Sequence, residues 1–81
     1  MRVGETIDME ETGNTIRWFR EKKGLKQYEV AEELDVAPSV YGRWERGLSL
    51  PSLDNAIRLA NLLEVYIEDF VIEYFEGDDD D

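Results

Sequence analysis

The residues GLKQYEVAEELDVAPSVYGRWERG, numbered 24–47, contain the pattern that decides the fold. Gly24 suits the left-handed position that ends a helix before it, and apolar residues follow it at helical spacing. Pro38 suits the first position of another helix, because its missing N–H would have no partner there in any case. The stretch therefore predicts two short helices, over residues 26–34 and 38–46, joined by a tight turn.

Helical spacing continues on both sides of this stretch. Asn14 or Thr15 suits the N-cap of a first helix that runs to about Lys23, and Ser52 suits the N-cap of a fourth helix. A fifth segment, Ile67 to Tyr74, is rich in large apolar residues, and no strand alternation is evident. The residues expected to face inward from the first and fourth helices are Ile16, Phe19, Arg20, Leu53, Ala56, Ile57, Ala60 and Leu63.

These elements predict an all-α fold, a compact five-helix domain over residues 13–75. An acidic arm over residues 1–12 is expected to precede the domain, and a disordered acidic tail over residues 76–81 to follow it. The net charge of the 81 residues is −11, but residues 14–58 carry eight basic and seven acidic side chains. Only this central segment is therefore suited to meet a polyanion.

The composition argues against an enzyme and against a metalloprotein. The chain has no cysteine and no histidine, so it lacks thiolate ligands, disulfides and the commonest general base. No cofactor, no metal and no catalytic residue is expected. No apolar stretch is long enough to span a membrane, and the acidic start lacks the apolar region of a secretory signal. We therefore expect no membrane contact and a cytoplasmic location.

Two helices at this spacing form the geometry that offers the second helix to the DNA major groove. The stretch over residues 13–71 also resembles the phage-repressor and xenobiotic-response-element (Cro/C1-type) helix-turn-helix family. The matching motifs, in order, are Arg20, Gly24-Leu25-x-Gln27, Ala31, Val36, Trp44-Glu45-Arg46-Gly47 and Pro51-Ser52-Leu53. The resemblance implies a lambda-repressor-like fold and a sequence-specific transcriptional regulator, which we expect to be a repressor.

The resemblance also implies roles for residues of the two central helices. The candidates for contacts with bases are Pro38, Ser39, Gly42 and Arg43, which match the outward face of the recognition helix. The candidates for contacts with phosphate are Lys26, Gln27 and Arg46. Arg43 suits a bidentate contact with guanine, whereas Pro38 offers a thymine methyl contact or simply starts the helix. Gly42 either lets the backbone approach DNA closely or is a tolerated helix defect.

The sequence departs from the family at several positions. Ala37 stands where a serine or threonine usually caps the third helix, and Asp35 and Glu64 stand where glycine is usual. Tyr41 replaces an aliphatic core residue, so a buried ring would need a partner for its hydroxyl. Arg20 and Glu45, by contrast, match positions that pair across the first and third helices in this family.

Apolar residues near the C-terminus exceed what one small core needs. Phe70, Val71, Tyr74 and Phe75, together with Leu59 or Leu62, predict a homodimer that reads a near-palindromic operator in double-stranded DNA. Trp18 is expected to face partly outward, either toward a partner or beneath the N-terminal arm. The alternative function is a protein-interaction module, such as an antitoxin, antirepressor or adaptor, with the same fold and little DNA binding. The charge of −11 favours that alternative.

Overall fold

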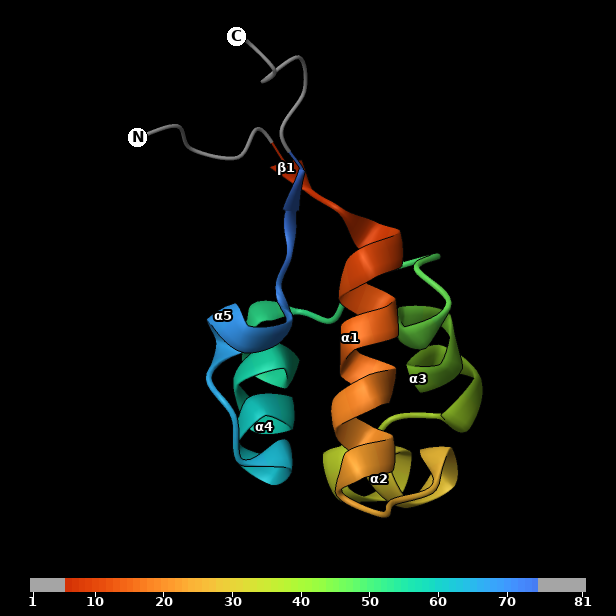
Figure 1. Cartoon of the computed structure of the whole chain (residues 1–81). Helices are drawn as coiled ribbons and strands as arrows, with labels where there is room; N and C mark the ends of the chain where they lie inside the picture. Colours follow the sequence, from red (N-terminus) through yellow and green to blue (C-terminus); the bar gives the residue numbers. More distant parts are fainter. Residues whose placement is uncertain (1–5, 75–81) are drawn as a thin grey trace, which may run out of the picture.

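The computed structural model describes residues 6–74, and five helices make up most of them (Figure 1). The helices are α1 (Met9–Lys22), α2 (Gln27–Leu34), α3 (Pro38–Glu45), α4 (Leu53–Leu63) and α5 (Ile67–Phe70). In Figure 1, α4 and α5 lie to the left of α1 and α3 lies to its right, while α2 crosses the lower end of α1. The expected five-helix, all-α architecture is therefore confirmed. The predicted residues 1–5 of the arm, Phe75 and the acidic tail lie outside the described residues.

The turns that join the central helices have the backbone that the sequence predicts. Asp35 after α2 and Glu64 after α4 adopt left-handed conformations, with φ angles of 58° and 61°. A residue other than glycine in this conformation lowers the stability of the fold by about 1–2 kcal/mol. Pro38 occupies the first turn of α3, and the Ser52 hydroxyl accepts the Asn55 amide hydrogen at 3.1 Å to cap α4. Local chemistry therefore determines where these elements begin and end.

The first helix begins earlier than the sequence analysis predicted. Asp8, rather than Asn14 or Thr15, is its N-cap, and its carboxylate accepts the Glu11 amide hydrogen at 3.0 Å. Two glutamates in the first turn favour this start, because the helix N-terminus carries partial positive charge. Residues 9–12 thus belong to α1 and not to a loose arm.

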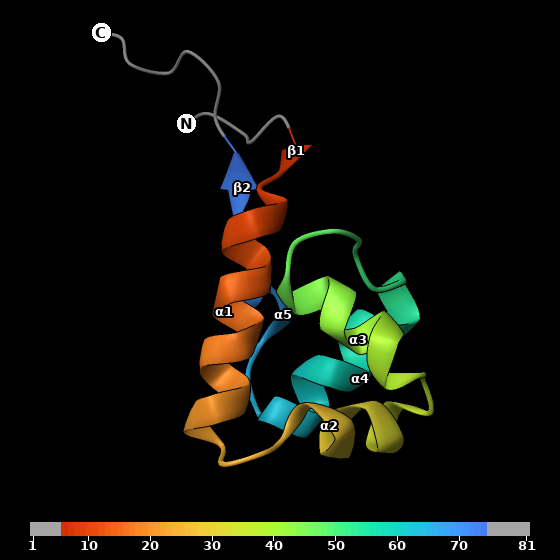
Figure 2. The ribbon, with the colours of Figure 1, turned by 90° about the vertical axis from the view of Figure 1, so that its right-hand side faces the viewer.

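The fifth segment is helical only as far as Phe70. The chain then extends into a strand, β2 (Glu73–Tyr74), which pairs antiparallel with β1 (Thr6–Ile7). Ile72 fixes this path, because its carbonyl accepts the Asp8 amide hydrogen at 2.7 Å. Its own amide donates to the hydroxyl of Thr12 at 2.9 Å. The prediction of a helix through Tyr74 was wrong, and the β1–β2 ribbon lies at the opposite end of the molecule from α2 (Figure 2).

The core lies where all five helices meet, and its composition corrects two expectations. The buried apolar residues are Ile16, Val30, Ala31, Leu34, Tyr41, Trp44, Ala56, Leu59, Ala60, Leu63 and Phe70. Phe70 and Leu59 are fully buried, so neither is available to a dimer interface. Leu53 and Ile57, which were expected inside, are 74% and 47% exposed. The predicted and observed faces of α4 overlap by three residues, and periodicity alone does not decide which flank faces inward.

Candidate nucleic-acid interface

The turn between α2 and α3 sets the two helices against each other and leaves one side of α3 outside. Ala37 provides no side-chain cap for α3, and Pro38 at its start has no amide hydrogen to satisfy. The inner side of α3 buries Tyr41, Trp44 and Glu45 against the rest of the domain. The outer side exposes Pro38, Ser39, Val40 and Arg43, so α3 is held from one face only.

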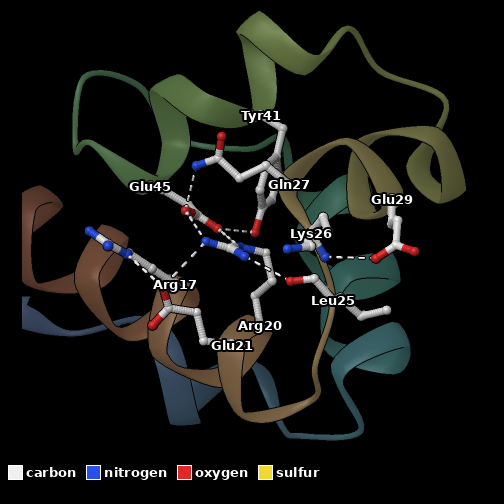
Figure 3. Close-up of polar contacts among 9 residues, drawn as sticks. All are labelled: Arg17, Arg20, Glu21, Leu25, Lys26, Gln27, Glu29, Tyr41 and Glu45. Atoms are coloured by element: carbon white, nitrogen blue, oxygen red, sulfur yellow. Dashed lines mark hydrogen bonds and ion pairs between the residues drawn. The ribbon is translucent and has the colours of Figure 1, made fainter.

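A buried polar cluster around Glu45 holds that inner face (Figure 3). Its carboxylate accepts two hydrogen bonds from Arg20 of α1, at 2.5 Å to Oε2 and 3.1 Å to Oε1. The hydroxyl of Tyr41 donates to Oε2 at 2.5 Å, and the side-chain amide of Gln27 donates to Oε1 at 2.8 Å. The guanidinium of Arg20 also donates to the carbonyl of Leu25 at 2.8 Å. One carboxylate thus ties α1, α2 and α3 together.

This cluster compensates the cost of burying charge. The side chains of Arg20 and Glu45 are only 9% and 2% exposed, and a buried ion pair is tolerated only when hydrogen bonds satisfy both partners. Burial by itself raises the pKa of Glu45, but the hydrogen bonds it accepts, that from Arg20 foremost, bring the pKa below its ordinary value. Burial and the bond to Glu45 raise the pKa of Tyr41. The carboxylate is therefore held ionised and the phenol neutral.

The main chain of α1 also touches the end of α3. Gly13 lies so close to α3 that a Cβ atom there would stand 2.5 Å from the carbonyl oxygen of Glu45 and 2.6 Å from that of Trp44. Gly47, just after α3, approaches Glu10 in the same way, because its Cβ would lie 2.9 Å from the Glu10 Cα. Because glycine has no Cβ atom, the main chain in the first turns of α1 can pack directly against the C-terminal end of α3.

A family model described as helix-turn-helix matches residues 16–70. The chain belongs to the Cro/C1-type helix-turn-helix family. Its members are DNA-binding transcriptional regulators, and α3 occupies the position of the family's recognition helix. The family assignment that the sequence motifs suggested is therefore confirmed.

Solved structures of helix-turn-helix regulators resemble this chain. The restriction-modification controller protein C.AhdI from Aeromonas hydrophila is 32% identical, with a TM-score of 0.72 over 78% of this chain and 96% of that one. The clp gene regulator ClgR from C. glutamicum is 29% identical, with a TM-score of 0.69 over 76% and 80%. The biofilm regulator SinR, solved in complex with DNA, is 31% identical, with a TM-score of 0.65 over 70% and 92%. No curated protein matches the chain.

The recognition helix carries most of the predicted base-contact residues on its outer side. Pro38, Ser39 and Arg43 are exposed, and Arg43 makes only a long contact, 3.4 Å from its Nη2 to the carbonyl of Leu48. Gly42 differs from expectation, because it is buried. A Cβ atom there would lie 3.2 Å from a guanidinium nitrogen of Arg46, so the absent side chain makes room for Arg46 and does not face outward.

The predicted phosphate-contact residues lie around the start of α2 and the end of α3. Lys26, Gln27 and Arg46 are all exposed. The Lys26 amide hydrogen is already bonded to the Glu29 carboxylate at 2.7 Å, which leaves its side chain as the group available to a phosphate. The resemblance also implies that Gln27 braces the recognition helix, and its side-chain amide donates to Glu45 of α3 at 2.8 Å. The same amide has a second hydrogen, so Gln27 can brace α3 and donate outward at once.

Sequence reasoning missed one residue of this surface, Val40. It is 41% exposed on the first turn of the recognition helix, beside Ser39. The signal was present in the sequence, because Val40 lies three residues before Arg43 and so on the same side of a helix.

None of the helices in residues 6–74 has the length and apolar character that a membrane-spanning helix needs.

Proposed function

We propose that the protein is a sequence-specific repressor that places α3 in the major groove of an operator. Pro38, Ser39 and Arg43 would meet base edges, with Arg43 suited to guanine O6 and N7. Lys26, Gln27 and Arg46 would contact phosphates on either side of the groove. The observation that carries this proposal is the division of α3. Its inner face is fixed by the buried carboxylate of Glu45, and its outer face is left free.

The small number of basic residues sets the expected strength of binding. The two basic phosphate-contact residues, Lys26 and Arg46, correspond to about four neutralised phosphates in a dimer, which would cost on the order of a hundredfold in affinity between roughly 50 and 200 mM salt. Acidic side chains on the exposed face of α2, Glu32 and Glu33, repel phosphates that are not held by these residues. We therefore expect weak non-specific binding and a marked dependence on the correct operator.

Selection of bound duplexes from a random pool, at two salt concentrations, tests this function. A common half-site should be enriched, and affinity for it should fall steeply with salt. Arg43→Ala should weaken binding to the selected duplex by about 1–3 kcal/mol more than binding to a scrambled one. Arg17→Ala is the matched control, because Arg17 is an exposed arginine of α1 paired with Glu21 at 3.1 Å. If no duplex is enriched at either salt concentration, the protein-interaction module replaces the repressor.

We still expect a homodimer, but we place its interface on α4 and no longer include Phe70. Leu53 and Ile57 are exposed on α4, and Leu53 lines an apolar hollow of about 320 Å³ together with Ile67 and Val71. Val71 is half-buried and Tyr74 is 46% exposed, so both remain available to a partner, unlike Phe70. A projecting leucine beside an apolar hollow is self-complementary across a two-fold axis. Two copies related in this way would set their recognition helices about 34 Å apart on a near-palindromic operator.

A further inference from the structure

Val40 is the one large apolar side chain that the recognition helix exposes. It is 41% exposed, whereas Tyr41 and Trp44 of the same helix are buried. A single exposed apolar residue is ordinary on a protein surface and carries no meaning by itself. Its place in α3 gives it meaning, because the N-terminal half of a recognition helix is the part that reaches base edges.

The neighbours of Val40 leave little other chemistry at this end of the helix. Pro38 has no amide hydrogen and an apolar ring, and Ser39 offers a single hydroxyl. Gly42 is buried, so it adds nothing to the outer face. The next group that can form several hydrogen bonds, the guanidinium of Arg43, is turned toward the carbonyl of Leu48 at the other end of the helix. The first turn of α3 therefore presents a mainly apolar surface.

An apolar surface recognises one feature of the major groove, the C5-methyl group of thymine. Valine suits that contact, since its β-branched side chain has one strongly preferred rotamer in a helix and loses little freedom on binding. We propose that Val40 is a specificity-determining residue that contacts a thymine methyl group in each half-site. The inference rests on the proposed function, because it requires α3 to lie in the major groove.

Removal of the methyl group from DNA tests this contact without changing the protein. In the duplex obtained by selection, each thymine is replaced in turn by deoxyuridine, which keeps the hydrogen-bonding edge and lacks only the C5-methyl group. For the unchanged protein, one such replacement should weaken binding by about fourfold per half-site, the effect expected for one buried methyl-sized group. Val40→Ala should bind the thymine and deoxyuridine duplexes with the same affinity.

Two further variants keep the result interpretable. Arg17→Ala changes an exposed residue of α1 that is paired with Glu21, outside the proposed DNA-binding surface, and should retain the fourfold preference for thymine. Val40→Thr preserves shape, β-branching and one γ-methyl group, so it should fold as the unchanged protein does and retain part of the preference for thymine. The inference is overturned if no deoxyuridine replacement alters the affinity of the unchanged protein, or if Val40→Ala keeps the full preference. Failure to enrich any duplex would instead overturn the proposed function.

Discussion

The side-chain amide of Gln27 donates to Oε1 of Glu45 over 2.8 Å, so an exposed residue at the start of α2 is bonded to a buried carboxylate at the end of α3. Glu45 is bonded in turn to Arg20 of α1. A phosphate that accepts the second amide hydrogen of Gln27 would therefore be two hydrogen bonds away from the domain core. This relationship makes Gln27 a positioning residue for α3 as well as a phosphate contact.

Gln27→Ala should weaken binding to every duplex by a similar factor. The variant loses one uncharged donor to phosphate, so affinity should fall for the operator and for a scrambled duplex alike, while the slope of log affinity against log salt should stay the same. Loss of the bond to Glu45 should also lower the free energy of unfolding by about 1 kcal/mol. Binding isotherms at several salt concentrations measure the first effect and urea unfolding the second. A loss confined to the selected operator would contradict the phosphate role.

Arg20 and Glu45 should be strongly coupled in stability. Replacing either partner alone, as in Arg20→Met or Glu45→Leu, leaves the other charge buried and should cost about 3–5 kcal/mol of unfolding free energy. The double variant should cost clearly less than the sum of the two. Urea unfolding of the four proteins completes the cycle. Additive effects would mean that the two side chains do not interact in solution.

Stability should fall in acid because of Glu45. Its pKa in the folded protein lies below the ordinary value of a glutamate, because Arg20, Tyr41 and Gln27 donate hydrogen bonds to it, so the unfolded chain binds the proton more readily. The stabilisation by Glu45 is therefore complete above the unfolded pKa and is lost as the pH falls through the folded pKa. Urea unfolding between about pH 2 and 7 should show this loss, and Glu45→Gln should show a smaller pH dependence. An unchanged pH profile in that variant would assign the acid sensitivity to other carboxylates.

The apolar surface on α4 should hold two copies together. The double variant Leu53→Ser with Ile57→Ser replaces two exposed side chains, so its helical content and thermal stability should be close to those of the unchanged protein. Light scattering at micromolar concentration should report a dimer for the unchanged protein and a monomer for the variant. Leu48→Ser serves as control, because Leu48 is 53% exposed and does not line the apolar hollow. A monomeric unchanged protein would exclude this interface.

Local sequence signals predicted the central part of the fold. Pro38, Ser52 and the left-handed residues Asp35 and Glu64 act through their own backbone or their nearest amide hydrogens, so their effects are visible in a short stretch of sequence. The pairing of Arg20 with Glu45 followed from the family motif. These features depend on a few residues at fixed spacing, and all of them occur in the structure.

Contacts between distant parts of the chain account for the errors. The path of residues 71–74 depends on hydrogen bonds that join Ile72 to Asp8 and Thr12, which no local pattern reveals. Gly42 was expected outside, but the long side chain of Arg46 folds back over it. Ser39 and Arg43 lie on the predicted face, while their contacts with bases remain a prediction.

The close approach of Gly13 to α3 means that one side of α3 positions the helix, while the other side is free to determine which DNA sequence is bound. Main-chain atoms of α1 lie against the carbonyls that end α3, so the C-terminal end of α3 is placed by contacts on its inner side. A change of outer residues would alter which duplex is preferred without altering where the helix lies. Exchanging only residues 39, 40 and 43 for those of another regulator, with Pro38 kept at the start of the helix, is therefore a route to a retargeted protein with its interior intact.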